Sequence, residues 1–314
     1  DSGNFNRYPS CQPDSVINGY ANYAGVDKSQ LIVTRGADEG IELLIRTFCT
    51  PGEDNILICP PTYGMYAISA ETCDVGIKRV PLNANFSLDV DGICATEDVN
   101  LVFICAPNNP TGTQVSKADL TAVLEHFADT ALVVVDEAYI EFDIDNTWAT
   151  QLAAYPNLVV LRTLSKAFAL AGLRCGFTIA SEAIIQSLLK VIAPYPIPEP
   201  VAQIVAQALT AENIARMQQQ VAFLNEQRTT LQAELAKLPG VALVGDVKAN
   251  YILFRHSHCA QIMQYLVSQG MLIRDQSKQL NLQNCLRVTI GSAEQNQRLL
   301  SLLDAYFEQA GASL

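Results

Sequence analysis

Between Leu31 and Ala180 the sequence alternates short, nearly continuous apolar runs with stretches of helical periodicity. A run with no polar face suits a strand that is covered on both sides, as in a parallel sheet flanked by helices. Strands that alternate with helices along the chain also favour parallel pairing. The alternation therefore predicts an α/β domain with a mostly parallel central sheet. We expect strands at 56–59, 101–105, 132–135, 158–161 and 175–180, and helices at 36–48, 63–71 and 117–127.

The pattern changes after residue 180. Residues 187–200 contain four prolines, at 194, 196, 198 and 200, and we expect no regular element there because proline lacks the amide proton. A long helical stretch, interrupted near Thr210, is expected over 201–238 and should end at Pro239-Gly240. Further strands are expected at 241–244, 251–254, 272–273 and 286–290, with helices at 261–268 and 293–309.

These two patterns predict a division of the chain into three parts. A large α/β domain covers 1–195, a connecting helical region covers 196–240, and a small α+β domain covers 241–314. A chain of 314 residues exceeds what one small core usually serves, which favours a second domain.

Charge and cysteine usage narrow the class of protein. The sequence has 32 acidic and 20 basic residues, a net charge of −12, which argues against nucleic acid or an anionic membrane as a partner. Nine cysteines, an odd number with no CxxC spacing, are typical of free thiols in a reducing cytosol. The three histidines lack zinc-site spacing, so we predict no metal. We therefore expect a cytoplasmic protein that acts on small molecules.

The turn PNNPTG at 107–112 directly follows the expected strand 101–105. Two prolines make it rigid, and its asparagines display amide groups at a strand end, where ligands gather in open α/β sheets. A plain turn would have the same composition, so this segment alone does not decide between structure and binding.

A second segment ends the expected strand 132–135 with Asp136, followed three positions later by Tyr139. A carboxylate there is costly to bury unless it meets a cation or a hydrogen-bond donor. The alternatives are a binding role, a helix cap or a structural salt bridge.

A third segment places Lys166 among small and apolar residues after the expected strand 158–161. Desolvation lowers the pKa of a lysine and yields a nucleophilic amine. Thr163, Ser165 and Arg174 lie nearby in the sequence, and hydroxyls with a guanidinium suit a phosphate. The alternative, an ordinary surface lysine, is disfavoured by the lack of other charges around it.

Together the three segments fit the chemistry of pyridoxal 5′-phosphate. That cofactor needs a lysine amine, an anion pocket and an acid to pair with its pyridine nitrogen. The glycine-led helix start at 36–40 adds backbone N–H groups that can bind the cofactor phosphate.

At this level of detail the chain resembles the fold-type I aminotransferases, and within them the histidinol-phosphate aminotransferase family. The resemblance extends over nearly the whole sequence. It is carried by PNNPTG at 107–112, DEAY at 136–139, SKAFALAGLRCG at 165–176, RYP at 7–9, RGADEG at 35–40, PPTYGMY at 60–66 and LRVTIG at 286–291.

The resemblance implies a role for each matched residue. Lys166, Asp136 and Tyr139 would be catalytic: Lys166 would form the Schiff base and shuttle the proton, and Asp136 would pair with the pyridine nitrogen. Tyr63 would stack on the ring. The other cofactor contacts would be Asn109 and Tyr139 at the phenolic oxygen, and Ala37, Asp38, Thr163, Ser165 and Arg174 around the phosphate.

Substrate and subunit contacts follow from the same resemblance. Arg274, Arg287 and Asn109 would bind the substrate, and Tyr8 would reach the cofactor phosphate of a partner subunit in a homodimer. Forked guanidiniums suit a site that must take a phosphate from one substrate and a carboxylate from the other. Arg287 lies within an apolar strand and so needs an anionic partner, whereas Arg274 has the context of a solvated charge.

The implied reaction is a reversible transfer of an amino group from glutamate, by way of the cofactor, to imidazole acetol phosphate. An aromatic or broad-specificity aminotransferase, a threonine-phosphate decarboxylase of the same fold and a catalytically silent cofactor-binding module remain alternatives. Family members carry an N-terminal arm with a second substrate-contacting tyrosine before the matched segment. This sequence begins close to Arg7, and we expect cofactor binding to survive without that arm.

Overall fold

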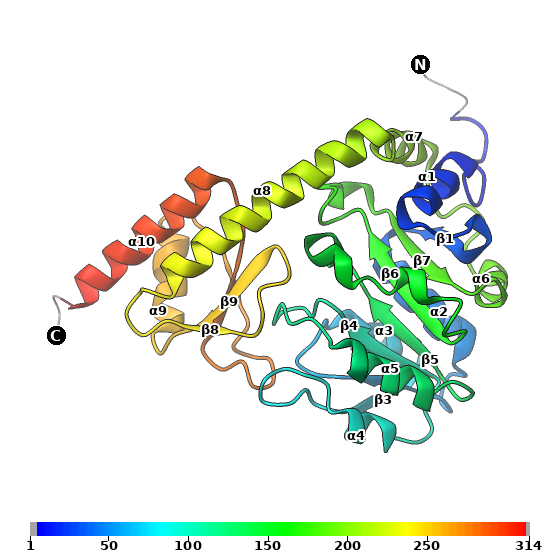
Figure 1. Ribbon diagram of the computed structural model, residues 1–314, viewed down its shortest axis with the longest axis horizontal. Helices are drawn as coiled ribbons and strands as arrows, with labels where there is room; N and C mark the ends of the chain where they lie inside the picture. The colour runs from blue at the N-terminus through cyan, green and yellow to red at the C-terminus, as the bar shows by residue number, and fades with distance from the viewer. Residues whose placement is uncertain (1–4, 312–314) are drawn as a thin grey trace.

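The computed structural model describes residues 5–311 and contains two sheets, a large one whose last strand ends at Ala180 and a small one whose first strand begins at Ala242 (Figure 1). The large sheet has seven strands in the order β1-β7-β6-β5-β4-β2-β3. All neighbours from β3 to β6 pair in parallel, whereas β7 is antiparallel to β1 and β6. The predicted α/β fold with a mostly parallel sheet is confirmed. Its strands are β1 (Leu31–Thr34), β2 (Asn55–Ile58), β3 (Gly76–Arg79), β4 (Leu101–Cys105), β5 (Leu132–Asp136), β6 (Leu158–Thr163) and β7 (Gly176–Ala180).

Both faces of the large sheet are buried, as its continuous apolar strands require. Alternate residues of a strand point to opposite faces, so Val102 and Ile104 of β4 enter one core while Leu101 and Phe103 enter the other. Residues from α1, α4, α5 and α7 join the first core, and residues from α2, α3 and α6 join the second. These helices are α1 (Asp14–Ala24), α2 (Gly36–Phe48), α3 (Met65–Thr72), α4 (Val90–Cys94), α5 (Lys117–His126), α6 (Glu182–Leu189) and α7 (Glu199–Ala208).

The small sheet is antiparallel, in the order β10-β11-β9-β8. Ile252 and Phe254 of β9 point into a core under helices, whereas Tyr251 points the other way and joins the core of the large sheet. The pleat of β9 therefore aims one aromatic ring at the large domain. The elements are β8 (Ala242–Val244), β9 (Tyr251–Arg255), β10 (Arg274–Asp275), β11 (Cys285–Thr289), α9 (Cys259–Ser268) and α10 (Ala293–Gly311).

One long helix, α8 (Ala211–Leu235), runs across both parts of the molecule (Figure 1). Met217 and Val221 near its start join the large core, and Leu231 and Leu235 near its end join the small one. The expected interruption lies at Thr210, whose hydroxyl accepts a hydrogen bond from the Asn213 N–H at 3.4 Å and caps the helix.

Two sequence-based expectations were wrong. The strand expected at 272–273 lies instead at Arg274–Asp275, because these two residues are the ones that pair with Arg287 and Leu286 of the next strand. The proline-rich segment 187–200 is not devoid of regular structure, since α6 continues to Leu189 and α7 starts at Glu199. Pro200 lies in the first turn of α7, where its missing amide proton would have had no helical partner.

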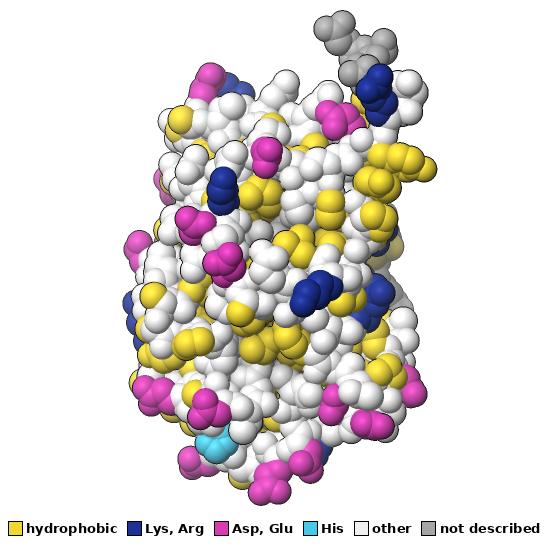
Figure 2. Space-filling view, turned by 90° about the vertical axis from the view of Figure 1, so that its right-hand side faces the viewer, with side chains coloured by type: hydrophobic (Ala, Val, Ile, Leu, Met, Phe, Trp, Pro, Cys, Tyr) yellow, Lys and Arg dark blue, Asp and Glu magenta, His cyan; other side chains and the backbone are white. Residues whose placement is uncertain are grey.

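The surface agrees with the acidic composition. On the face shown in Figure 2, basic side chains are scattered and acidic ones gather along the lower edge of the view. Within residues 5–311, no helix has the length and apolar character needed to cross a bilayer.

Candidate active site

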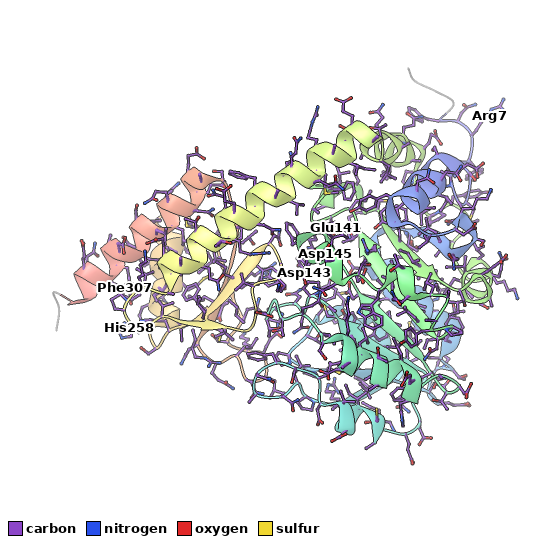
Figure 3. The ribbon with its side chains drawn as sticks, in the orientation of Figure 1. Arg7, Glu141, Asp143, Asp145, His258 and Phe307 are labelled. Carbon is purple, nitrogen blue, oxygen red and sulfur yellow. The ribbon has the colours of Figure 1, made fainter. Side chains whose placement is uncertain are left out.

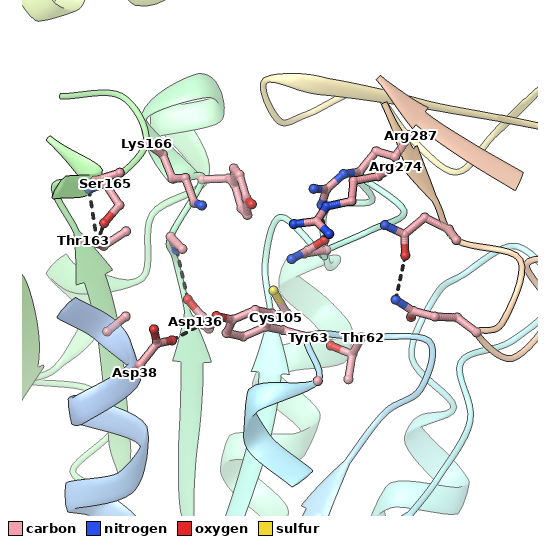
Figure 4. Close-up of a pocket in the computed structure, with 18 of the residues that line it drawn as sticks. Asp38, Thr62, Tyr63, Cys105, Asp136, Thr163, Ser165, Lys166, Arg274 and Arg287 are labelled. Carbon is pink, nitrogen blue, oxygen red and sulfur yellow. Dashed lines mark hydrogen bonds between the residues drawn. The ribbon is translucent and has the colours of Figure 1, made fainter. Parts of the chain in front are cut away.

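A cavity of about 480 Å³ opens at the carboxyl ends of β4, β5 and β6. Almost all of the residues singled out in the sequence line it, although they come from both sheets (Figure 4). Those residues are Ala37, Asp38, Tyr63, Asn109, Asp136, Tyr139, Thr163, Ser165, Lys166, Arg174, Arg274 and Arg287.

Asp136 ends β5 at the floor of the cavity with only 2% of its surface exposed. Each of its carboxylate oxygens has one protein donor: the Tyr66 hydroxyl donates to Oδ2 at 2.6 Å and the Ala138 N–H to Oδ1 at 3.0 Å. Burial raises the pKa of Asp136 to about 6, and the Tyr66 and Ala138 hydrogen bonds oppose that rise. The site therefore holds a buried acid whose charge lacks a full counter-ion.

Lys166 follows β6 and extends into the cavity above that floor (Figure 4). Its Nζ lies 5.3 Å from the centre of the Tyr139 ring. Burial lowers the pKa of Lys166, and the nearby Arg287 guanidinium lowers it further. Both effects favour the neutral, nucleophilic amine.

One end of the cavity is built to hold an anion. Arg174 Nη1 lies 3.4 Å from Ser165 Oγ, and Ser165 Oγ accepts a hydrogen bond from the Thr163 hydroxyl at 2.9 Å. The start of α2 faces the same space, because residue Gly36 has φ +78° and a Cβ atom there would lie 2.8 Å from Arg174 Nη2. Guanidinium, hydroxyls and a helix N-terminus are the usual partners of a phosphate.

Asp38 does not offer its side chain to that anion. Its carboxylate pairs with Arg174 Nη2 at 3.1 Å and accepts a hydrogen bond from the Tyr63 hydroxyl at 2.9 Å. An anion at this end can receive only the backbone N–H of Asp38, while its carboxylate orients the Tyr63 ring and the guanidinium.

The opposite end of the cavity carries two arginines on neighbouring strands. Arg274 of β10 lies directly across from Arg287 of β11 in the sheet register. Arg287 Nη1 donates to Asn109 Oδ1 at 2.5 Å, and its Cζ lies 4.7 Å from the centre of the Tyr251 ring. Its Nε is buried and has no hydrogen-bond partner among the described residues. Two guanidiniums side by side at the same end of a cavity favour a bound anion.

Tyr8 is the one predicted site residue that lies outside this cavity. It is 81% exposed, and its ring stacks on that of Tyr195 at a centroid distance of 4.5 Å. The neighbouring Arg7 lies at the far edge of the large domain in Figure 3. A contact from Tyr8 to a partner subunit therefore stays a prediction.

No role was assigned from the sequence to several residues in and around the site. Tyr66 and Tyr251 are completely or almost completely buried, and each makes a hydrogen bond that shapes the cavity. Gln276 and Gln279 line the arginine end, where the Gln279 amide donates to Gln276 Oε1 at 2.8 Å. Only the PPTYGMY motif around Tyr66 could have drawn attention to one of them.

These residues fit pyridoxal 5′-phosphate. The fit rests on the buried Asp136 carboxylate, which suits a protonated ring nitrogen, and on an amine and a phosphate cradle around the same cavity. The second anion site at the arginines then remains for a substrate.

Comparison with known proteins agrees with this interpretation of the cavity. The model of the family described as aminotransferase class I and II matches residues 1–303. The chain belongs to this aminotransferase family. A relative named histidinol-phosphate aminotransferase from Pseudoalteromonas atlantica is 65% identical over 98% of this chain and 83% of its own length. Another of that name, from Aeromonas hydrophila, is 54% identical over 96% of this chain and 85% of its own length.

Solved structures show the same aminotransferase fold. A histidinol-phosphate aminotransferase from Clostridium acetobutylicum superposes with a TM-score of 0.89 at 24% identity, over 98% of this chain and 92% of that one. One from Sinorhizobium meliloti, in complex with pyridoxal-5′-phosphate, superposes with a TM-score of 0.86 at 20% identity, over 97% and 85% of the two chains.

Proposed function

We propose that this aminotransferase moves an amino group reversibly between L-glutamate and imidazole acetol phosphate, giving 2-oxoglutarate and L-histidinol phosphate in histidine biosynthesis. The observation that carries the proposal is the Arg274–Arg287 pair, which shares one cavity with Lys166 and Asp136. The names of the relatives at 54% and 65% identity support it.

The cofactor is pyridoxal 5′-phosphate, which when bound supplies an electron sink for the carbon that gains or loses the amine. Thr163, Ser165, Arg174 and the first backbone N–H groups of α2 would hold its phosphate. Asp136 would pair with its ring nitrogen from the cavity floor.

Lys166 is the residue that moves the proton. Because burial and Arg287 lower its pKa, more of the amine is neutral, and the neutral amine can accept a proton and return it. Tyr139 packs beside it, and burial raises the pKa of the Tyr139 hydroxyl to about 12, so that this group stays protonated and can donate.

The arginines select the substrates. Histidinol phosphate presents a phosphate and glutamate presents carboxylates, and a forked guanidinium binds either anion. Arg287 lines the cavity and is held in place by Asn109 and the Tyr251 ring, so its guanidinium is fixed where it can meet the anion. Arg274 is exposed at the mouth and can adjust to the size of the substrate.

The homodimer belongs to the same proposal. Tyr8 and Tyr195 form an exposed aromatic pair at the edge of the large domain, which suits a contact with a second copy of the chain. In that dimer Tyr8 would reach the cofactor phosphate of the other subunit. A cytoplasmic location stays a prediction.

The decisive experiment compares amino donors. The cofactor-loaded protein is mixed with histidinol phosphate, phenylalanine or threonine phosphate, and 2-oxoglutarate-dependent turnover and carbon dioxide release are measured. We expect the highest kcat/KM with histidinol phosphate and no turnover in Lys166→Ala. Faster turnover of phenylalanine would indicate an aromatic aminotransferase instead. Carbon dioxide release from threonine phosphate would indicate a decarboxylase, and turnover of no donor would indicate a silent binding module.

A further inference from the structure

Tyr66 lies behind the cavity wall and has no exposed surface. It is the second residue of α3, and its ring stacks on Phe103 of β4 with centroids 5.0 Å apart and an interplanar angle of 17°. The stacking fixes the ring, so the hydroxyl has one position, 2.6 Å from Asp136 Oδ2. Since Tyr66 is absent from the lining of the cavity, it cannot act on a substrate directly.

The hydrogen bond determines how Asp136 faces the cavity. With the Ala138 N–H on Oδ1 and the Tyr66 hydroxyl on Oδ2, both oxygens are held and the carboxylate cannot rotate. A bond from a hydroxyl to a buried carboxylate also replaces part of the lost hydration, which favours the ionised form. The other charged groups that act on Asp136 are Asp38, which opposes ionisation, and Lys166, which favours it.

We propose that Tyr66 is a positioning residue for the cofactor: its hydroxyl holds the Asp136 carboxylate in the orientation and charge that pair with a protonated ring nitrogen. The inference rests on the proposed function only in requiring pyridoxal 5′-phosphate. The proposal gives α3 a part in cofactor recognition, although none of its residues is among those that line the cavity.

The first test is the affinity for the cofactor of the apoprotein. Tyr66→Phe keeps the stacked ring and removes the hydroxyl, and we expect the dissociation constant of pyridoxal 5′-phosphate to rise about tenfold or more. Tyr20→Phe is the matched control, because Tyr20 is equally buried and its hydroxyl has no partner among the described residues. It should bind the cofactor as tightly as the unmodified protein.

The second test is a spectroscopic pH titration of the cofactor-loaded protein. If the negative charge at Asp136 weakens, the ring nitrogen becomes less positive, and the nitrogen of Lys166 bonded to the cofactor keeps its proton to higher pH. The midpoint of the visible absorption change should therefore rise in Tyr66→Phe by about one pH unit. A hydroxyl with a purely structural role would leave this midpoint unmoved, as we expect for Tyr20→Phe.

A double variant tests whether the effect of Tyr66 passes through Asp136. In an Asp136→Asn background, Tyr66→Phe should change neither the cofactor affinity nor the midpoint further, because its effect passes through the carboxylate. Additive effects, or a Tyr66→Phe protein that titrates like the unmodified one, would overturn the inference. Neither test needs an amino donor, so a protein that binds no cofactor at all contradicts the proposed function instead.

Discussion

At the level of single residues, the most unusual feature outside the cavity is a buried group of three charges. Arg162 is 2% exposed, and its guanidinium contacts Glu137 Oε2 at 2.7 Å and Glu141 Oε1 at 3.4 Å. Glu137 also accepts hydrogen bonds from the Trp148 N–H and the Thr147 hydroxyl, whereas Glu141 Oε2 has no partner within the described part of the chain. Glu141 lies beside α8 in Figure 3. The two acids are therefore not equivalent.

This difference predicts unequal losses of stability for two matched substitutions. Glu137→Gln leaves Arg162 without its main counter-charge, so the free energy of unfolding should fall by about 3–5 kcal/mol. Burial raises the pKa of Glu141 to about 7, so its ionised form costs stability above pH 7, a cost that is absent below about pH 4.5. Glu141→Gln at pH 8 removes that cost but also removes the 3.4 Å ion pair with Arg162, so the two effects oppose each other and the free energy of unfolding should change by less than about 1 kcal/mol. Urea unfolding at pH 8 measures both, and equal losses would contradict the assignment.

The buried charge of Asp136 lowers the stability of the folded apoprotein. Its pKa in the folded apoprotein, about 6, lies above the ordinary value of 3.8, so folding favours the protonated form. The penalty is absent at low pH, grows as the pH rises through the interval between these two values, and is complete above about pH 6. Relative to the unmodified apoprotein, Asp136→Asn should gain about 1–2 kcal/mol of stability between pH 5 and pH 8. Unfolding at the two pH values checks this, and a pH-independent difference would disprove it.

At the level of elements, the strands that were predicted are those whose burial leaves a local pattern in the sequence. The strands β4 and β5 are buried on both faces and appear as continuous apolar runs, so their positions were predicted within one residue. The edge strand β3 is half exposed, with a charged end at Arg79, and gave no such run. Most site residues within motifs were predicted. Tyr66, although it ends the PPTYGMY motif, and Tyr251 were not predicted, because each acts through a partner distant in the sequence.

The anion-binding end depends on a close approach between two elements. Gly176 begins β7, and a Cβ atom there would lie 2.5 Å from the backbone of both Gly36 and Ala37 at the start of α2. Gly176→Ala must therefore displace the helix start, and we expect cofactor affinity to fall at least tenfold with a loss of about 1–3 kcal/mol in stability. Gly172→Ala is the control, because nothing lies within 4 Å of its Cβ position. Equal cofactor affinities for the two variants would mean that the helix start does not hold the phosphate.

At the level of the whole molecule, the site is complete only where the two sheets meet. The small sheet docks on the turn that carries Asn109: the Tyr251 hydroxyl donates to the Asn108 carbonyl at 2.6 Å and the Lys248 N–H to that of Gly112 at 3.1 Å. Gly245 permits the contact, since with φ +72° a Cβ atom there would lie 2.2 Å from the Thr111 carbonyl oxygen. Arg287, which we propose binds the substrate, is thus positioned against Asn109 by the packing of the small sheet on this turn.

In the proposed homodimer, each cavity also needs Tyr8 from the other subunit. This predicts a result that a site built from one chain alone would not give. Lys166→Ala inactivates its own cavity but keeps Tyr8, whereas Tyr8→Ala keeps the lysine but deprives the partner's cavity of the tyrosine. Each variant alone should have little activity. If Tyr8 acts across the interface, a mixed dimer contains one cavity with both residues intact. When the two proteins are unfolded and refolded together, half of the randomly paired dimers are mixed, and one of the two cavities in each mixed dimer is active. The mixture should therefore recover about one quarter of the unmodified activity per subunit. Activity no higher than that of the separate variants would place Tyr8 in its own subunit's site or outside any site, and size-exclusion chromatography of each variant controls for loss of the dimer.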